Sequence, residues 1–239
     1  MTTTSHNKIQ KQWKISDQPS LDGFTDAGSG LPILIRTLLA KRGIKDTESA
    51  RHHLSKPKKF TDPVLMPNLS KAVDRLVQSC EINEKVAILG DFDVDGVTAT
   101  TLLTEGLTNL GLNPIPYIPD RFSEGYGPNI SAIQKLAEKE VTLLITADCG
   151  TSSVNEIDEA NRLGMEVIII DHHAIPATLP SAYAIVNPKL NDLYGSEPAA
   201  VGVAYKVLTA LYEVMDVPYD HTSHQSLVAL GTICDLVPL

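Results

Sequence analysis

The chain has few cysteines, no long apolar run and no excess of positive charge, and each shortage limits what it can be. Its three cysteines, Cys80, Cys149 and Cys234, are an odd number without metal-binding spacing, which favours a reducing compartment over a disulfide framework. No stretch approaches the roughly 20 apolar residues of a membrane span. The polar start at Met1 lacks the apolar centre of a signal peptide. We therefore expect a soluble, cytoplasmic protein with no membrane association.

The net charge of −9 argues, at face value, against a nucleic-acid partner, because such proteins usually carry a basic footprint. The distribution of charge weakens this argument, since much of the acid lies later in the chain and bound cations would offset part of it. The first quarter of the chain is rich in basic residues, namely Lys8, Lys11, Lys14, Arg36, Lys41, Arg42, Lys45, Arg51, Lys56, Lys58 and Lys59. Charge alone does not decide the question.

The chain of 239 residues is long enough for one large domain or one and a half. Residues 1–30 are polar, and we expect a flexible N-terminal arm there. Residues 31–239 are predicted to form one domain, with a helical lead-in over 31–84 and an α/β core over 85–239. Apolar residues at helical spacing predict helices in the lead-in at Leu31–Arg42, Asp46–Leu54 and Ser70–Cys80.

Short apolar runs alternate with helical patterns from Lys85 onward. The predicted strands are Val86–Leu89, Ile115–Ile118, Thr142–Thr146, Val167–Ile170 and Ala182–Val186. The predicted helices are Val97–Leu110, Ser131–Glu140, Val154–Leu163, Ala199–Met215 and His221–Ile233. This alternation predicts an α/β fold, with a mostly parallel sheet covered by helices on both faces.

Three aspartates, Asp91, Asp93 and Asp95, follow the first predicted strand at alternate positions. If the segment stays extended, the three side chains lean to one side. Like charges so close repel one another unless a cation lies among them. We therefore predict a metal site here rather than an ordinary acidic loop.

Two other predicted strands also end in residues that bind metals. Asp148 follows the strand at Thr142–Thr146, and the run Asp171–His173 follows Val167–Ile170. Parallel strands end at one edge of the sheet, where these side chains can converge. Carboxylates with imidazoles suit Mn²⁺, Fe²⁺ or Zn²⁺, or Mg²⁺ where imidazoles are fewer. Five or six candidate ligands predict two metal ions about 3.5–4 Å apart.

A pair of metal ions at a sheet edge suits the hydrolysis of phosphate esters, because it activates water and neutralises charge on phosphate oxygens. We predict that His172 binds metal and that its neighbour His173 faces the scissile phosphate. Gly150, Thr151 and Ser152 precede a predicted helix, whose free N–H groups would bind a phosphate. A plain helix cap is the alternative for that segment.

These residues resemble a known family. Asp91-x-Asp93, Asp148-Cys-Gly150, Asp171-His-His173 and the terminal Gly231–Leu239 run are similar to the four ordered motifs of the DHH phosphoesterases. The runs Gly90–Gly96 and Arg121-Phe-Ser-Glu-Gly-Tyr-Gly127 resemble the RecJ type within that family, single-strand-specific 5′→3′ DNA exonucleases of repair and recombination. The resemblance extends from about Pro32 to Leu239.

The resemblance implies roles for particular residues. It implies metal ligation by Asp91, Asp93, Asp148, His172 and Asp235, phosphate binding or activation by His173, and DNA contacts by Arg121 and Tyr126. It further implies two divalent cations, Mn²⁺ or Mg²⁺, and single-stranded DNA as substrate. A single-strand-binding protein or a helicase is a candidate partner, and we expect a monomer.

The chain departs from the family at three points, one of which is the small change of a Gly-Val-Gly pattern to Ala200-Val-Gly202. Leu89 stands where some members have a metal-binding histidine. Either Asp95 or a water would then complete that site. Asp95 is also our further candidate for a catalytic carboxylate. Members of the RecJ type also continue past the Val-Pro-Leu motif into DHHA1 and OB domains. We expect these to be absent here and the nuclease activity to be impaired.

Two alternatives to this interpretation stay open. One is a DHH phosphoesterase for small substrates, such as short oligonucleotides, cyclic dinucleotides or pyrophosphate. The other is a non-catalytic DNA-binding scaffold.

Overall fold

The computed structural model describes residues 17–24, 30–55, 62–191 and 197–237. The chain divides into two compact units, Met1–Phe60 and Thr61–Leu239, each of which is described by itself. Most of the predicted arm, and the basic residues Lys56, Lys58 and Lys59, lie outside the described residues. Among the helices described, none combines the length and apolar character needed to cross a membrane.

The described part of the first unit contains two short helices, α2 (Ile33–Lys41) and α3 (Thr47–Leu54). Helix α3 begins where its sequence predicts, because the Asp46 carboxylate accepts a hydrogen bond from Ser49 N at 2.8 Å. Phe24, Leu39 and Ala50 are the buried centre of a small apolar cluster.

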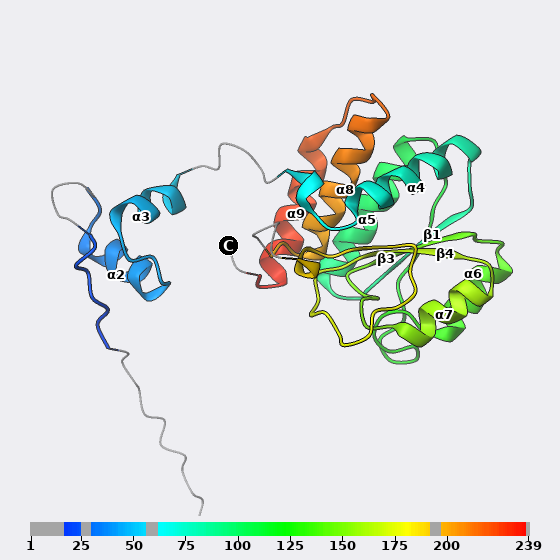
Figure 1. Ribbon diagram of the computed structural model, residues 1–239, viewed down its shortest axis with the longest axis horizontal. Helices are drawn as coiled ribbons and strands as arrows, with labels where there is room; N and C mark the ends of the chain where they lie inside the picture. Colours follow the sequence, from blue (N-terminus) through cyan, green and yellow to red (C-terminus); the bar gives the residue numbers. More distant parts are fainter. Residues whose placement is uncertain (1–16, 25–29, 56–61, 192–196, 238–239) are drawn as a thin grey trace, which may run out of the picture. The chain divides into compact units, whose positions relative to one another are not determined.

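The second unit is built on a five-stranded parallel sheet in the order β2-β1-β3-β4-β5 (Figure 1). The strands are β1 (Val86–Gly90), β2 (Ile115–Tyr117), β3 (Leu143–Ala147), β4 (Glu166–Ile170) and β5 (Ala184–Val186). β1 and β3 pair along their whole length, with Val86 opposite Leu143 and Gly90 opposite Ala147. Strands β1 and β3 therefore end at the same level.

Helices cover both faces of this sheet (Figure 1), as the alternating pattern predicts. Alternate strand residues, such as Ile88 and Ile145, pack with the helices of one face, and their neighbours Ala87 and Leu144 pack with those of the other. The first face carries α4 (Leu69–Ile82), α5 (Val94–Asn109) and α8 (Ala200–Val214), and the other carries α6 (Ile130–Glu138) and α7 (Val154–Arg162). The final helix, α9 (His221–Cys234), packs on α5 and α8. Two short 3-10 helices, Pro63–Leu65 and Pro188–Leu190, complete the unit. The predicted fold class is confirmed.

The start of α5 differs from the sequence-based prediction. We expected an extended segment as far as Asp95, but α5 already begins at Val94. Asp93 is its N-cap, and the Asp93 carboxylate accepts a hydrogen bond from Gly96 N at 2.9 Å. Asp95 therefore lies in the first helical turn, and the argument from alternating faces is wrong for this residue.

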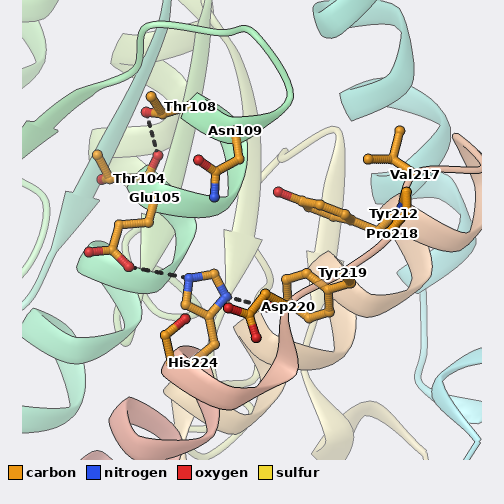
Figure 2. Close-up of a pocket in the computed structure, with 11 residues that line it drawn as sticks. Thr104, Glu105, Thr108, Asn109, Tyr212, Val217, Pro218, Tyr219, Asp220 and His224 are labelled. Atoms are coloured by element: carbon orange, nitrogen blue, oxygen red, sulfur yellow. Dashed lines mark hydrogen bonds and ion pairs between the residues drawn. The ribbon is translucent and has the colours of Figure 1, made fainter.

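A hollow of about 470 Å³ lies beside α5, α8 and α9, lined among others by Glu105, Tyr212, Tyr219 and His224 (Figure 2). The buried His224 ring connects the elements around it, because Nδ1 is 2.7 Å from Tyr219 Oη and Nε2 is 3.3 Å from Glu105 Oε2. The α9 residues that line this hollow lie in the first half of the helix, whereas Asp235 lies at its other end. It is therefore separate from the predicted metal ligands.

Candidate metal centre

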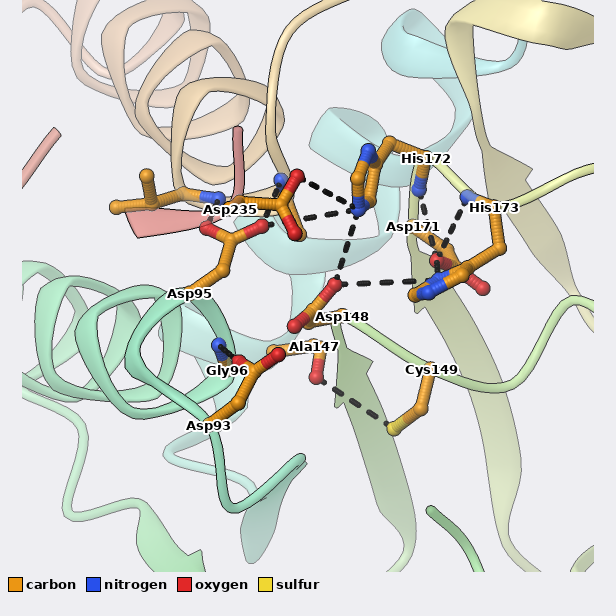
Figure 3. A network of polar contacts seen from close by, with 12 residues as sticks. Asp93, Asp95, Gly96, Ala147, Asp148, Cys149, Asp171, His172, His173 and Asp235 are labelled. Atoms are coloured by element: carbon orange, nitrogen blue, oxygen red, sulfur yellow. Dashed lines mark hydrogen bonds and ion pairs between the residues drawn. The ribbon is translucent and has the colours of Figure 1, made fainter. Parts of the chain in front are cut away.

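The carboxyl edge of the sheet gathers the predicted ligands (Figure 3). Asp91, Asp148 and Asp171 each follow directly on a strand, β1, β3 and β4 respectively. Asp235 reaches the same place from the C-cap of α9. Asp91, Asp148 and Asp171 come together because parallel strands end at a common edge, and helix α9 adds Asp235 to them.

His172 is at the centre of the cluster. Its Nε2 atom lies 3.3 Å from Asp148 Oδ1, 3.6 Å from Asp235 Oδ2 and 3.8 Å from Asp95 Oδ2. The residue is 7% exposed. A buried imidazole nitrogen that faces three carboxylates is the arrangement expected of a metal ligand.

Ligand atoms within 4.8 Å of one another form three overlapping groups. Asp91, Asp93 and Asp148 make the first group, and Asp148, His172 and His173 make the second. The third joins Asp95, His172 and Asp235. Because Asp148 belongs to two groups, and so does His172, the geometry suits two neighbouring cations that share a carboxylate.

The oxygen and nitrogen atoms that would bind a metal themselves indicate that a cation fits here. Asp91 Oδ1, Asp148 Oδ1 and His172 Nε2 are buried and have no hydrogen-bond partner in the part of the chain that the structure describes. Unpaired buried polar atoms are costly, so each needs a compensating group. Burial, followed by the charges of Asp95 and Asp93, raises the pKa of Asp148 to about 10. A divalent cation would remove this repulsion.

The backbone after β3 turns sharply to place Asp148. This residue has a φ of 63°, in the left-handed region that non-glycine residues rarely adopt. Gly150 follows with a φ of 107°, and a Cβ there would lie 2.6 Å from Thr146 Oγ1. Strained backbone of this kind is often found where a side chain is held for function.

Asp171 holds His173 in place, a role that the sequence-based interpretation did not assign. Asp171 Oδ1 is 2.7 Å from His173 Nδ1 and accepts hydrogen bonds from the backbone N–H groups of His172 and His173. This partner raises the pKa of His173 to about 9, although burial opposes the shift. The aspartate of the Asp-His-His run was a signal that could have identified this pairing.

Asn187 is a second residue that the sequence did not reveal. It follows β5, and its Nδ2 atom donates to His173 O at 3.0 Å and to Thr151 Oγ1 at 3.3 Å. Asn187 therefore connects the two loops that carry His173 and Thr151. Its position just after a strand at the carboxyl edge was the available signal.

Asp95 makes contacts different from those of the other aspartates. Oδ2 accepts a hydrogen bond from Ala200 N at 2.6 Å, and Oδ1 accepts one from Val201 N at 2.9 Å. Both oxygens thus bind the first turn of α8, where carboxylates are favoured. The contacts favour a positioning role for Asp95, and its catalytic role stays a prediction.

The predicted phosphate-binding segment is arranged differently from a free helix start. Helix α7 begins only at Val154, beyond Gly150, Thr151 and Ser152. The N–H of Thr151 donates to Asp171 Oδ2 at 3.0 Å, and the Thr151 side chain is buried. Ser152 is exposed. Thr151 therefore supports the Asp171 carboxylate, and its N–H is not free for a phosphate.

Arg121 and Tyr126 lie on the loop between β2 and α6. The Arg121 guanidinium is 5.1 Å from the centre of the Phe92 ring. Tyr126 Oη lies 3.3 Å from His173 Nε2, and the Tyr126 and Phe92 rings meet edge to face at 6.3 Å. The loop is thereby connected to the metal centre through Tyr126.

Comparison with known proteins identifies the family of this fold. Residues 85–232 match the model of the DHH family, N-terminal domain. The chain belongs to the DHH family. Among curated relatives, the single-stranded-DNA-specific exonuclease RecJ of Bacillus subtilis is 42% identical over 95% of this chain, and RecJ of Escherichia coli is 32% identical over 92%. This DHH chain spans only 29% and 40% of their respective lengths.

Solved structures show the same fold. A crystal structure of exonuclease RecJ bound to manganese matches with a TM-score of 0.68 and 34% identity, over 73% of this DHH chain and 44% of that chain. RecJ from Thermus thermophilus in complex with Mn²⁺ matches with a TM-score of 0.67 and 29% identity, over 86% and 28%. The same protein has been solved with Mg²⁺. The recognition of the family from its motifs is confirmed.

Leu89 lies in β1 and is fully buried among the apolar residues beneath α6 and α7. It supplies no polar atom to the centre. Cys149, nearby, does not replace a ligand there, because its Sγ lies 3.7 Å from Leu89 O and burial raises the pKa of its thiol.

Proposed function

We propose that the unit from Thr61 to Leu239 is the catalytic domain of a RecJ-type nuclease, which hydrolyses phosphodiester bonds of single-stranded DNA from the 5′ end. The observation that supports this most strongly is the cluster of buried, potentially metal-binding atoms without a hydrogen bond on Asp91, Asp148 and His172, among the described residues. Membership of the DHH family and the similarity to exonucleases named RecJ indicate the substrate.

Asp91, Asp93, Asp148, His172 and Asp235 would hold two divalent cations, Mn²⁺ or Mg²⁺. When bound, such ions lower the pKa of a water molecule and neutralise charge on phosphate oxygens. Hard carboxylate donors with one central imidazole agree with either ion.

His173 would contact the phosphate. Its Nδ1 atom is engaged by Asp171, while its ring is half exposed and its Nε2 atom faces the Tyr126 hydroxyl. A ring held in this way can present Nε2 to a phosphate oxygen without losing further rotational freedom. Arg121, exposed on the neighbouring loop, would bind a phosphate of the strand.

Asp93→Asn is the sharpest test, because asparagine caps a helix as well as aspartate does but carries no charge. The assay is nucleotide release from 5′-phosphorylated single strands with Mn²⁺, using labels at either end to read the direction. We expect the variant to lose at least 100-fold in activity with its thermal unfolding temperature unchanged.

Asp74→Asn, on the exposed face of α4, is the matched control and should behave as the wild type. Release that does not depend on metal, or full activity of Asp93→Asn, would contradict the proposal. A preference for dinucleotides over long strands would favour a DHH phosphoesterase for small substrates.

A further inference from the structure

Phe122 is almost fully exposed to solvent, which is unusual for an aromatic residue in a folded protein. It lies on the loop between β2 and α6, and 95% of the residue is exposed. The residues on either side, Arg121 and Ser123, are exposed as well. The exposed ring is therefore flanked in sequence by polar residues, unlike the apolar core of a protein interface.

The loop that carries Phe122 is held in place by several hydrogen bonds. Asp120 Oδ1 accepts hydrogen bonds from Phe122 N at 3.0 Å and from Ser123 N at 2.9 Å. The Glu124 carboxylate accepts from Asp120 N at 2.9 Å and from Lys135 at 2.8 Å, which anchors the loop to α6. These bonds set the backbone of Phe122, so its exposure is a property of an ordered turn.

The same loop joins the metal centre. The Arg121 guanidinium lies over the ring of Phe92, which sits between the ligands Asp91 and Asp93 in sequence. The Phe92 ring meets that of Tyr126, and the Tyr126 ring meets that of His173 at 6.2 Å. A row of flat side chains thus runs from His173 through Tyr126 and Phe92 to Arg121, the residue before Phe122.

We propose that Phe122 stacks on an unpaired nucleobase of the strand whose phosphates reach the metal centre. This inference rests on the proposed function and adds a specificity-determining residue to it. Every base has a π face, so one ring binds any sequence. In a duplex that face is covered by neighbouring bases, and Phe122 would thereby favour single strands.

The test compares Phe122→Ala with Phe122→Tyr, which keeps a ring, on two probes. The first probe is a 5′-phosphorylated dT₁₂ oligonucleotide, and the second is a twelve-residue abasic strand with the same phosphates. Equilibrium binding is measured by fluorescence anisotropy, and KM and kcat are measured with Mn²⁺. Ile82→Ala, also exposed but preceding β1 at the opposite edge of the sheet, is the control.

We expect Phe122→Ala to weaken dT₁₂ binding by roughly 5- to 100-fold, to raise KM similarly and to leave kcat nearly unchanged. Phe122→Tyr should match the wild type, and on the abasic strand all variants should bind alike. Equal binding of dT₁₂ by wild type and Phe122→Ala, or an equal loss on both probes, would overturn the inference.

The binding measurement separates this inference from the proposed function. If the wild type binds dT₁₂ but does not cleave it, hydrolysis is disproved while the comparison of Phe122 variants still decides the stacking. If the wild type binds neither probe, both proposals fail.

Discussion

Replacing Asp95 with asparagine would show whether this carboxylate holds α8 or binds a cation. The variant keeps one oxygen acceptor, but its amide group must then face one of the two N–H donors, Ala200 N or Val201 N. Loss of one charge-assisted hydrogen bond costs about 1.5–3 kcal/mol, and loss of the charge at the start of α8 costs about 0.5 kcal/mol more. Relief of repulsion among the carboxylates offsets part of this, so we expect a loss of about 2 kcal/mol.

The assay is urea unfolding followed by circular dichroism, once with EDTA and once with saturating Mn²⁺. With a slope of about 2 kcal/mol per molar urea, the midpoint should fall by about 1 M. If Asp95 only positions α8, the loss is the same in both conditions. If Asp95 were a ligand, a tenfold weaker binding of Mn²⁺ would add about 1.4 kcal/mol to the loss in Mn²⁺ alone. An unchanged midpoint in EDTA, or such a difference, would refute the positioning role.

One further substitution tests the fold, and another tests how the fold supports the site. Burial opposes the shift, but hydrogen bonds from Arg75, Ser79 and Thr142 lower the pKa of Glu84 from 4.5 to about 2. The stability that ionised Glu84 contributes is therefore lost as the pH falls through that interval. In urea unfolding at pH 5 and pH 2.5, wild type should lose roughly 2 kcal/mol more than Glu84→Gln does. A Cβ at Gly231 would lie 2.5 Å from Thr98 Oγ1, so Gly231→Ala should shift α9 with Asp235 and weaken Mn²⁺ binding at least tenfold by calorimetry. Gly202→Ala is the matched helical control, and equal Kd values for the two variants would contradict the second expectation.

Much of the fold could be predicted because local patterns and tertiary structure agree. The apolar runs at Val86 and Leu143 are buried on both faces, as strands in the middle of a parallel sheet must be. The convergence of Asp91, Asp148 and His172 followed from the rule that such strands end at one edge. No long-range information was needed for either step.

Other features depended on contacts that a local pattern does not show. The sequence pattern does not predict the first turn of α5, because the alternation of Asp91, Asp93 and Asp95 is typical of an extended segment, although aspartate is also a favoured N-cap residue. The hydrogen bond from Thr151 N to Asp171 joins the ends of two neighbouring strands. Its effect on the predicted phosphate site was therefore invisible in sequence.

The most direct test of the metal centre is anomalous X-ray scattering from crystals grown with Mn²⁺. We predict two peaks at the carboxyl edge of the sheet, one near Asp91 and Asp93, the other near His172 and Asp235, with Asp148 between them. No peak at this edge, or peaks bound only by side chains elsewhere, would contradict the account.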